Sequence, residues 1–382
     1  MSSSSKDTRQ SVLGHVPGWD ITRLSEARVM VVGAGALGNE VMKNLALLGV
    51  REMVIVDFDH VEISNLSRSI LFRASDQEKL KAEVAALRVQ EINPQIQTQA
   101  IVGDILCDVG FGTIREMDLI FGCLDNRLAR LWLNRWAFRA GKPWIGGGIL
   151  NTSGQVVIYE QEGACYECSL TKQGWEDIQH RMGCPDMAQR YFNNGIQPTT
   201  PIAASIIAGT MVQEGLKILF GHERDRLKGQ MWLYEGQQLH AEVYELTASN
   251  PNCLSHFNWP APQEVSDVSL TSTLGQVFAR LESEFGEPVW IDLDHPIALE
   301  ISTLVSKEVY PFVKPLLHLS KEMAESYRKI PQEGLGVPAG KLASRLDRSF
   351  PYQEKTLAEL GFPPKHVLRV NCKGNKYYIL IR

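Results

Sequence analysis

The chain has 382 residues, which is too long for one ordinary domain and predicts two or three. With 44% hydrophobic and 22% charged residues, its composition is that of a globular protein and excludes a disordered or collagen-like chain. The formal net charge of −5 favours neither a nucleic acid nor a membrane as partner. No apolar run approaches the ~18 residues of a membrane span, and the start of the chain lacks a secretion signal, so we expect a cytoplasmic protein.

Strand and helix patterns alternate from residue 28 onward. Arg28–Gly33 is a short apolar strand, Asn39–Leu48 has helical spacing, and Met53–Asp57 is a second buried strand that ends in an acidic residue. The alternation continues through a helix at Gln77–Glu91, strands at Ala100–Val102 and Leu119–Phe121, a helix at Arg127–Arg139 and a strand at Pro143–Gly146. We therefore predict an α/β fold whose main domain has a Rossmann-like, mostly parallel sheet.

The later part of the chain predicts where this domain ends. A strand pattern returns at Gln155–Tyr159, and a long apolar helix is predicted at Ile202–Phe220. Prolines beyond Pro251 mark a linker. We predict a first domain at residues 1–257, in which 165–200 is a cysteine-bearing crossover segment, and a smaller α+β domain at 264–382.

The connection after the first strand has the pattern Gly-x-Gly-x-x-Gly, with Gly33, Gly35 and Gly38. Glycines there let backbone N–H groups and the positive end of a helix approach a phosphate chain. Asp57, at the end of the second strand, suits the hydroxyls of a ribose, which leaves both NAD and ATP open.

Cationic residues past the second strand separate these two nucleotides. Arg68 and Lys81 add more positive charge than the pyrophosphate of a dinucleotide needs. A triphosphate that expels pyrophosphate requires cations where negative charge accumulates. The pattern therefore favours ATP.

Several motifs in the same order resemble those of the ubiquitin-activating enzyme superfamily, which includes the bacterial adenylyltransferases of molybdopterin and thiamine biosynthesis. The motifs are the glycine loop, Asp57-x-Asp59, Asn65-Leu-x-Arg68, Lys81 and Cys123-Leu-Asp125-Asn126. The resemblance spans residues 8–257 and implies an adenylation domain.

In that superfamily, the pattern implies a role for each matching residue. Asp57 binds the ribose within the Asp57-x-Asp59 pair, and Asp125 holds Mg²⁺. The triphosphate is surrounded by Asn65, Arg68 and Lys81. Arg9 resembles an N-terminal arginine that also reaches the triphosphate, in the bacterial homodimers from the partner subunit. We therefore expect a homodimer or heterodimer that forms through the adenylation domain.

Cysteine spacing predicts a metal site. Cys165 and Cys168 form one pair with zinc-ligand spacing, and Cys253 and His256 form another. Many superfamily members carry two Cys-x-x-Cys pairs at corresponding places, and here His256 stands for the fourth cysteine. Since four protein ligands leave no open coordination position, we predict a structural Zn²⁺.

Cys184 has the surroundings of a nucleophile, because His180 and Arg181 favour its thiolate. Its place resembles that of the thioester-forming cysteine in the catalytic subunit of the neddylation activating enzyme, while a surface cysteine or an alternative metal ligand remains open. The other cysteines lie in or beside apolar runs and are expected to be packing residues: Cys107, Cys123 and Cys372.

The second domain shows helix patterns at Leu274–Glu284 and Ile297–Lys307 and a strand between them. Thr356–Val370 followed by Lys376–Ile381 resembles the end of a ubiquitin-like β-grasp, where a short helix turns into an edge strand. A generic α+β module is the alternative. In eukaryotic activating enzymes, a ubiquitin-fold domain at this end recruits the conjugating enzyme.

These features support three functional hypotheses. The first, which we favour, is ATP-dependent activation of a ubiquitin-like β-grasp protein, by adenylation and then a thioester on Cys184 that passes to a conjugating enzyme. The second stops at the adenylate and serves a sulfur-carrier protein. The third is a non-catalytic scaffold subunit, which would need neither Lys81 nor Asp125. ATP and Mg²⁺ are the cofactors implied by the first two.

Overall fold

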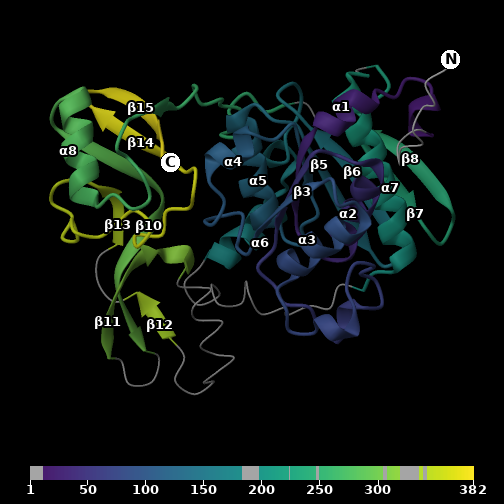
Figure 1. Cartoon of the computed structure of the whole chain (residues 1–382), viewed down its shortest axis with the longest axis horizontal. Coiled ribbons are helices and arrows are strands. Elements are labelled where there is room, and N and C mark those ends of the chain that lie inside the picture. The colour runs from purple at the N-terminus through teal and green to yellow at the C-terminus, as the bar shows by residue number, and fades with distance from the viewer. Residues whose placement is uncertain are drawn as a thin grey trace, which may run out of the picture. The chain divides into compact units, whose positions relative to one another are not determined.

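The computed structural model describes residues 12–182, 198–222, 224–246, 249–303, 308–318, 335–338 and 342–382, which fall into two compact units (Figure 1). The first unit holds the described residues of Met1–Ile105, Ile114–Leu170 and Gln197–Phe257. The second holds those of Leu106–Thr113, Thr171–Ile196 and Asn258–Arg382. This division passes through the chain at Phe257, but it also assigns two segments of the predicted first domain to the second unit.

An 8-stranded sheet forms the centre of the first unit, in the order β3-β2-β1-β4-β5-β6-β7-β8. Its strands are β1 (Arg28–Val32), β2 (Glu52–Val56), β3 (Gln97–Ile101), β4 (Leu119–Gly122), β5 (Trp144–Leu150), β6 (Ser153–Tyr159), β7 (Gln230–Glu235) and β8 (His240–Glu245). Neighbouring strands from β3 to β5 are parallel, and those from β5 to β8 are antiparallel. The predicted Rossmann-like, mostly parallel sheet is confirmed.

Helices precede and connect these strands, and one of them, α4, begins in the second unit. They are α1 (Ile21–Glu26), α2 (Ala36–Leu48), α3 (Lys81–Ile92), the short α4 (Phe111–Arg115), α5 (Arg127–Ala140) and α7 (Pro201–Phe220). Single 3₁₀ turns are η1 (Leu13–His15), η2 (Ile63–Asn65), η3 (Ala74–Asp76) and η4 (Glu167–Ser169). Two helices begin elsewhere than predicted. α2 starts at Ala36, directly after the glycine loop, and α3 starts at Lys81, because the residues before it form η3 and a turn.

Both faces of the parallel sheet are covered. α2, α3 and α7 share one apolar core with alternate strand residues such as Val31, Ile55 and Phe121. Met30 and Ile120 alternate with these residues, so they point to the opposite face, and both are fully buried. Burial on both faces is the usual environment of a parallel sheet.

α7 contradicts the expectation that no apolar stretch of the chain is long enough to span a membrane. By length and composition alone, it meets the criteria for a membrane-crossing helix, with a mean hydropathy of 1.3. Ser205 and Thr210 interrupt its apolar residues, which conceals the run in the sequence. A buried core helix meets the same criteria. Because Ile207, Met211 and Leu216 lie in the core cluster, we describe α7 as a core helix.

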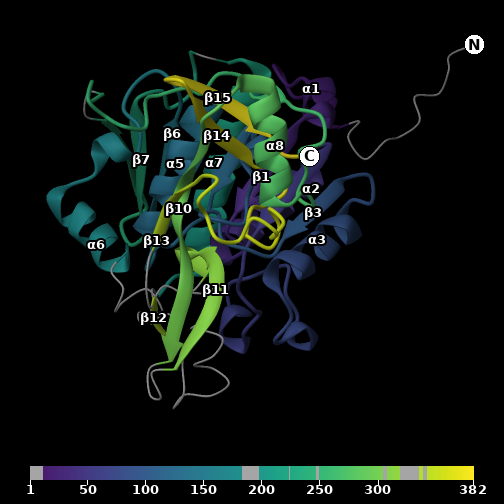
Figure 2. The ribbon, with the colours of Figure 1, turned by 90° about the vertical axis from the view of Figure 1, so that its left-hand side faces the viewer.

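The second unit is built on a 7-stranded sheet with a central path β11-β10-β14-β15-β9, from which β12 and β13 pair with β10. Its elements are α6 (Lys172–Met182), β9 (Gln263–Glu264), α8 (Leu274–Phe285), β10 (Val289–Thr303), β11 (Val309–Pro315), β12 (Leu335–Pro338), β13 (Leu342–Leu346), β14 (Val367–Cys372) and β15 (Asn375–Leu380). Figure 2 shows α8 beside β14 and β15, and Phe278 of α8 shares a core with Val370 and Ile379 of those strands.

Two predictions for this unit are wrong. The described part of the helix predicted at Ile297–Lys307 is a strand, since β10 continues to Thr303. Ile297, Leu299 and Ile301 alternate with smaller or polar residues, which is the strand period, and β10 is long enough to pair with several neighbours. β14 lies between β10 and β15 rather than at an edge. Residues 357–361 form turns instead of a helix, so the likeness to a β-grasp stays a prediction.

The segment Leu106–Thr113 is held by later residues of the second unit. The backbone N–H of Gly112 donates to the carbonyl of Lys365 (2.8 Å). The ring of Phe111 packs on Trp259, with 4.7 Å between ring centroids. The second unit is therefore made from separate stretches of the chain.

Candidate functional site

The glycine loop lies where β1 ends, between the ends of β2 and β4. The N–H of Gly33 donates to the carbonyl of Val56 (2.8 Å), and the N–H of Cys123 donates to that of Val32 (2.8 Å). Because β1 leads to β2 on one side and lies beside β4 on the other, this is the point where the strand order reverses. Ligands of open α/β sheets bind in the crevice at such a point.

The three glycines have different physical roles. A Cβ at Gly33, where φ is +97°, would lie 2.3 Å from the carbonyl oxygen of Cys123. A Cβ at Gly38 would lie 1.9 Å from the carbonyl oxygen of Gly33. At Gly35, no atom of the described residues lies within 4 Å of the corresponding position. Gly33 and Gly38 are therefore required by packing, whereas Gly35 faces open space at the start of α2, where a phosphate could approach.

Asp57 orders the loop as well as facing the crevice. Its Oδ2 accepts the N–H of Ala34 (2.7 Å), and its Oδ1 accepts the N–H of Asp59 (2.8 Å). Burial raises the pKa of Asp57 to about 6, against the lowering effect of Lys81. A carboxylate has about four acceptor positions, so these two bonds leave capacity for the hydroxyls of a ribose.

Lys81 places a buried ammonium group beside the same crevice. Its side chain is almost fully covered, and its Nζ donates to Oδ2 of Asp59 (3.0 Å). Burial lowers the pKa of Lys81, but the charges of Asp57 and Asp59 outweigh that effect and raise it overall. Lys81 is thus a positive charge at neutral pH. The structure brings together Asp57, Asp59 and Lys81, as the shared motifs suggested.

Asn39 was not singled out from the sequence, although it links two parts of the site. Its side chain is fully buried. Its Nδ2 donates to the carbonyls of Ala34 (2.8 Å) and Gly35 (3.0 Å), and its Oδ1 accepts the N–H of Leu71 (2.9 Å). A polar residue on the apolar face of α2, one position after Gly38, was the available signal.

The segment that Asn39 holds through Leu71 carries Asn65 and Arg68. Asn65 closes η2 by accepting the N–H of Glu62 (3.1 Å) on its Oδ1. Arg68 donates from Nη1 to the carbonyl of Ser64 (2.8 Å). Both side chains are partly exposed and follow β2. Their contact with a triphosphate remains a prediction.

Asp125 lies on the other side of β1, in the connection between β4 and α5, and its side chain is exposed. Its neighbour Asn126 caps α5 by accepting the N–H of Ala129 (2.8 Å). Arg130 was also missed in the sequence. Its Nη2 donates to the carbonyls of Leu124 (2.5 Å) and Gly147 (2.6 Å), which fastens this connection to β5.

Magnesium prefers oxygen ligands and usually keeps several waters, so one or two carboxylates together with substrate phosphates can hold it. Asp125 is suited to that role because its carboxylate is exposed at the ligand-binding edge of the sheet. Among the described residues, Asp125 belongs to neither group of three or more metal-ligating side chains. The nucleotide itself would therefore have to complete the magnesium site.

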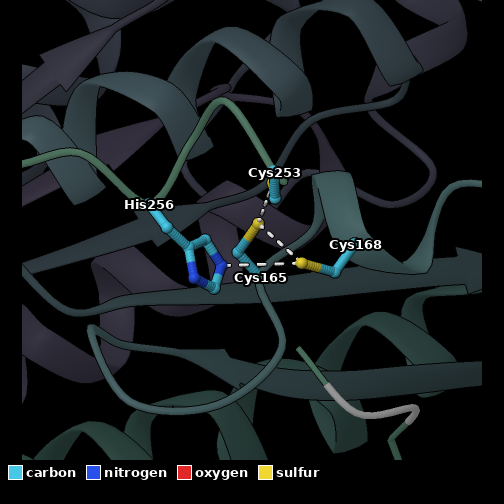
Figure 3. A group of neighbouring side chains, drawn as sticks. All are labelled: Cys165, Cys168, Cys253 and His256. Carbon is cyan, nitrogen blue, oxygen red and sulfur yellow. Dashed lines mark hydrogen bonds between the residues drawn. The ribbon is translucent and has the colours of Figure 1, made fainter. Parts of the chain in front are cut away.

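Four predicted zinc ligands converge in the same unit (Figure 3). Sγ of Cys165 lies 3.7 Å from Sγ of Cys168 and 3.5 Å from Sγ of Cys253. Sγ of Cys168 lies 3.5 Å from Nε2 of His256. A tetrahedral ion with zinc–sulfur bonds of about 2.3 Å needs sulfur–sulfur separations of about 3.8 Å. The side chains therefore fit Zn²⁺.

A buried polar network surrounds these ligands. Glu167, between the first two cysteines, accepts two bonds from Arg135 (3.1 and 2.7 Å) and one from Ser255 (2.5 Å). Asn134 donates to Ser255 (2.9 Å) and accepts the N–H of Tyr166 (3.1 Å). Burial raises the pKa of Glu167, but the bonds from Arg135 and Ser255 lower it overall, so the carboxylate is ionised. The network joins the two ligand pairs independently of a metal.

Burial disfavours the ionised form of two of the three thiols. Burial raises the pKa of Cys165, and it raises that of Cys253 to about 12. Zinc binds thiolates, so binding would release protons from these groups. Burial also raises the pKa of Cys123 to about 12, which agrees with its predicted role in packing. Arg9 and Cys184, two predicted catalytic residues, lie outside the described residues.

Comparison with known proteins identifies relatives of the first unit. The ThiF family pattern matches residues 8–255. The sulfur carrier protein adenylyltransferase of Thermus thermophilus is 31% identical over 266 residues, covering 68% of this chain and 93% of that enzyme. The NEDD8-activating enzyme E1 catalytic subunit of Caenorhabditis elegans is 37% identical over 180 residues, but the match covers only 43% of this chain and 42% of that subunit.

A solved structure agrees with the fold. E. coli MccB has a TM-score of 0.51 and 21% sequence identity, covering 64% of this chain and 68% of MccB. At this level of identity, the likeness concerns the fold alone.

Proposed function

Because the chain belongs to the ThiF family, we propose that it is an ATP-dependent adenylyltransferase that acts on the C-terminal carboxylate of a small β-grasp sulfur-carrier protein. The Thermus relative, whose name states this activity, matches over 93% of its own length. Support for the sulfur-carrier hypothesis is therefore broader than for thioester transfer, which we favoured from the sequence alone.

The observation that carries this proposal is the open space at Gly35 beside the Asp57, Asp59 and Lys81 group. Phosphates would lie against the N-terminus of α2, which carries unpaired N–H groups and positive potential. Asp57 would accept bonds from the ribose on the β2 side. Lys81 would exchange part of its interaction with Asp59 for contact with the triphosphate.

In the proposed reaction, a carboxylate oxygen of the carrier attacks the α-phosphorus of ATP. The bond between the α-phosphorus and the bridging oxygen breaks, so that pyrophosphate leaves and an acyl adenylate forms. Lys81 and Arg68 would stabilise the negative charge that accumulates on the leaving group. Magnesium at Asp125 would neutralise phosphate charge when bound.

Pyrophosphate exchange tests this proposal directly. The full chain is incubated with ATP, labelled pyrophosphate and a sulfur-carrier protein, or with the same carrier lacking its last residue. We expect label to enter ATP only with the intact carrier, and Asp125→Ala to suppress it. Absence of exchange with all sulfur-carrier and ubiquitin-like proteins offered would contradict the proposal and favour the scaffold hypothesis.

Thioester formation on Cys184 is a second candidate function. It is supported by the 37% identity to the nematode NEDD8-activating subunit. The adenylate would then pass its acyl group to the thiolate, with release of AMP. A thiol-sensitive adduct that disappears in Cys184→Ala, while pyrophosphate exchange continues, would establish this step. Normal exchange without any adduct would leave adenylation alone.

A further inference from the structure

A second group of metal-ligating side chains lies in the other unit. Cys107 and Asp108 are consecutive residues of the Leu106–Thr113 segment, and His318 follows β11. Potential ligand atoms of the three residues all lie within 4.8 Å of one another. We propose that Cys107, Asp108 and His318 bind a second Zn²⁺ ion.

The histidine is already oriented for such a site. Its Nε2 lies 3.1 Å from Oδ1 of Asp108. Ligands at bond lengths of about 2.0–2.1 Å around a tetrahedral ion are separated by about 3.3 Å, which is close to this distance. The Nδ1–Cε1 edge of the ring lies beside Gly361, where an added Cβ would be 2.9 Å from both atoms. The ring thus lies between Gly361 and Asp108, with Nε2 on the side of Asp108.

The donor types and their exposure specify the kind of ion. A sulfur, a nitrogen and a carboxylate oxygen suit Zn²⁺, whereas Mg²⁺ and Ca²⁺ prefer oxygen ligands throughout. Cys107 is buried. The side chain of Asp108 is 22% exposed and that of His318 is 16% exposed. Three protein ligands therefore leave one coordination position that water can reach. The Cys165 group, by contrast, supplies four ligands.

The ion would fasten two distant parts of the chain. Asp108 and His318 are separated by 210 positions in the sequence. Cys107 and Asp108 come from within the stretch matched by the family pattern, whereas His318 lies beyond it. None of the three residues takes part in the proposed adenylation reaction. Metal binding at this site can therefore be measured without an activity assay.

Metal content of the full-length protein tests this site. Protein saturated with Zn²⁺ and then dialysed should retain about two zinc ions per chain, and Cys107→Ala or His318→Gln about one. His295→Gln is the matched control, because His295 contacts the carbonyl of Leu106 (3.0 Å) without being one of the three ligands. It should retain about two. About one ion in the wild-type protein, or an unchanged count in both variants, would overturn the proposal.

A titration of the wild-type protein keeps the proposal testable if the variants fail to fold. Co²⁺ reports on thiolate ligands through its visible and near-ultraviolet absorption. We expect absorbance to rise in two phases that saturate at about two equivalents, since the two groups offer different numbers of sulfur ligands. Saturation at about one equivalent would show that Cys107, Asp108 and His318 form only a polar contact.

Discussion

The predicted nucleotide-binding edge, with the glycine loop, Asp57 and Lys81, lies in the same unit as the Cys165 group of Cys165, Cys168, Cys253 and His256. The two satisfy their polar side chains in different ways. At the edge, the charges are already paired in the ligand-free chain, since Asp57 accepts backbone N–H groups and Lys81 contacts Asp59. In the Cys165 group, three sulfurs and one ring nitrogen face one another, and burial raises the pKa of the Cys165 and Cys253 thiols. Asp57 and Lys81 are thus held by bonds within the chain, whereas a bound ion would stabilise the thiolates of the Cys165 group.

Because of this difference, substitutions at the first site should affect function, and substitutions at the second should affect stability. Damage to the nucleotide-binding edge should impair binding or catalysis while the unit stays folded, because internal bonds hold its backbone. Damage to the zinc ligands should impair folding first, because metal-binding free energy contributes to folding free energy. Four predictions test this contrast.

The largest effect is expected for Cys253→Ser. Loss of one ligand should release the zinc, and structural zinc sites contribute on the order of 10 kcal/mol in small domains. We expect metal content and the melting temperature of the first unit to fall together. Cys372→Ser is the control, since Cys372 is buried in the other unit, where its Sγ donates to the carbonyls of Phe285 and Gly286 (both 3.3 Å). Unchanged zinc content in Cys253→Ser would contradict the assignment.

Lys81→Met should lower the rate of adenylation by about 10²–10³-fold, because it removes a buried charge where the leaving group develops its own. The matched control is Lys79→Met, which alters a largely exposed lysine that pairs with Asp76 (3.0 Å). Steady-state pyrophosphate exchange and the melting temperature are measured for both. If the two variants were equally active, Lys81 would have no role in catalysis.

Asn39→Ala should cost about 1–3 kcal/mol of unfolding free energy and also weaken ATP binding, because the N–H of Leu71 and the loop carbonyls lose their partner. Asn93→Ala offers a comparison, since Asn93 is also buried and donates to the carbonyl of Ala46 (3.2 Å) away from the loop. Denaturant titration and ATP affinity separate the two. Only Asn39→Ala is expected to raise the KM for ATP.

The smallest effect concerns pH. Since burial raises the pKa of Asp57 to about 6, its carboxylate is ionised above that pH and protonated below it. Protonation removes an acceptor, so ATP affinity should fall as pH decreases through 6, by up to about tenfold per unit. Calorimetric titration between pH 5 and about 8 measures this. Asp57→Asn should bind ATP weakly without this dependence. A wild-type affinity that stays constant would contradict the role of Asp57.

Much of the first unit could be predicted from sequence because its signals are local. Apolar strands, the glycine pattern and a terminal acid together indicate a βαβ unit and the edge where a ligand binds. The spacing of Cys165 and Cys168, repeated in Cys253 and His256, likewise indicated the group that the structure brings together. Such local patterns can be recognised without knowing the contacts made by distant residues.

The missed residues depend on contacts between distant positions. Asn39 and Arg130 act by bonding backbone groups of other segments, which no spacing rule reveals. The helix predicted at Ile297–Lys307 failed for a similar reason. Its apolar residues fit two periods, and pairing with β11, β12 and β13 decides in favour of a strand. Cys107 was expected only to pack. No spacing rule could link it to His318, which lies 210 positions from its neighbour Asp108.

Because the second unit is made from separate stretches of the chain, evolution cannot remove its C-terminal stretch without affecting residues near position 110. Gly112 and Phe111, which lie within the family's own stretch of sequence, are contacted by Lys365 and Trp259. A gene that lost its 3′ portion would leave these residues without their neighbours and expose the buried ring of Phe111. Residues 258–382 therefore help to bury residues of the family's own stretch. Gain or loss of these residues would require compensating substitutions near residue 110.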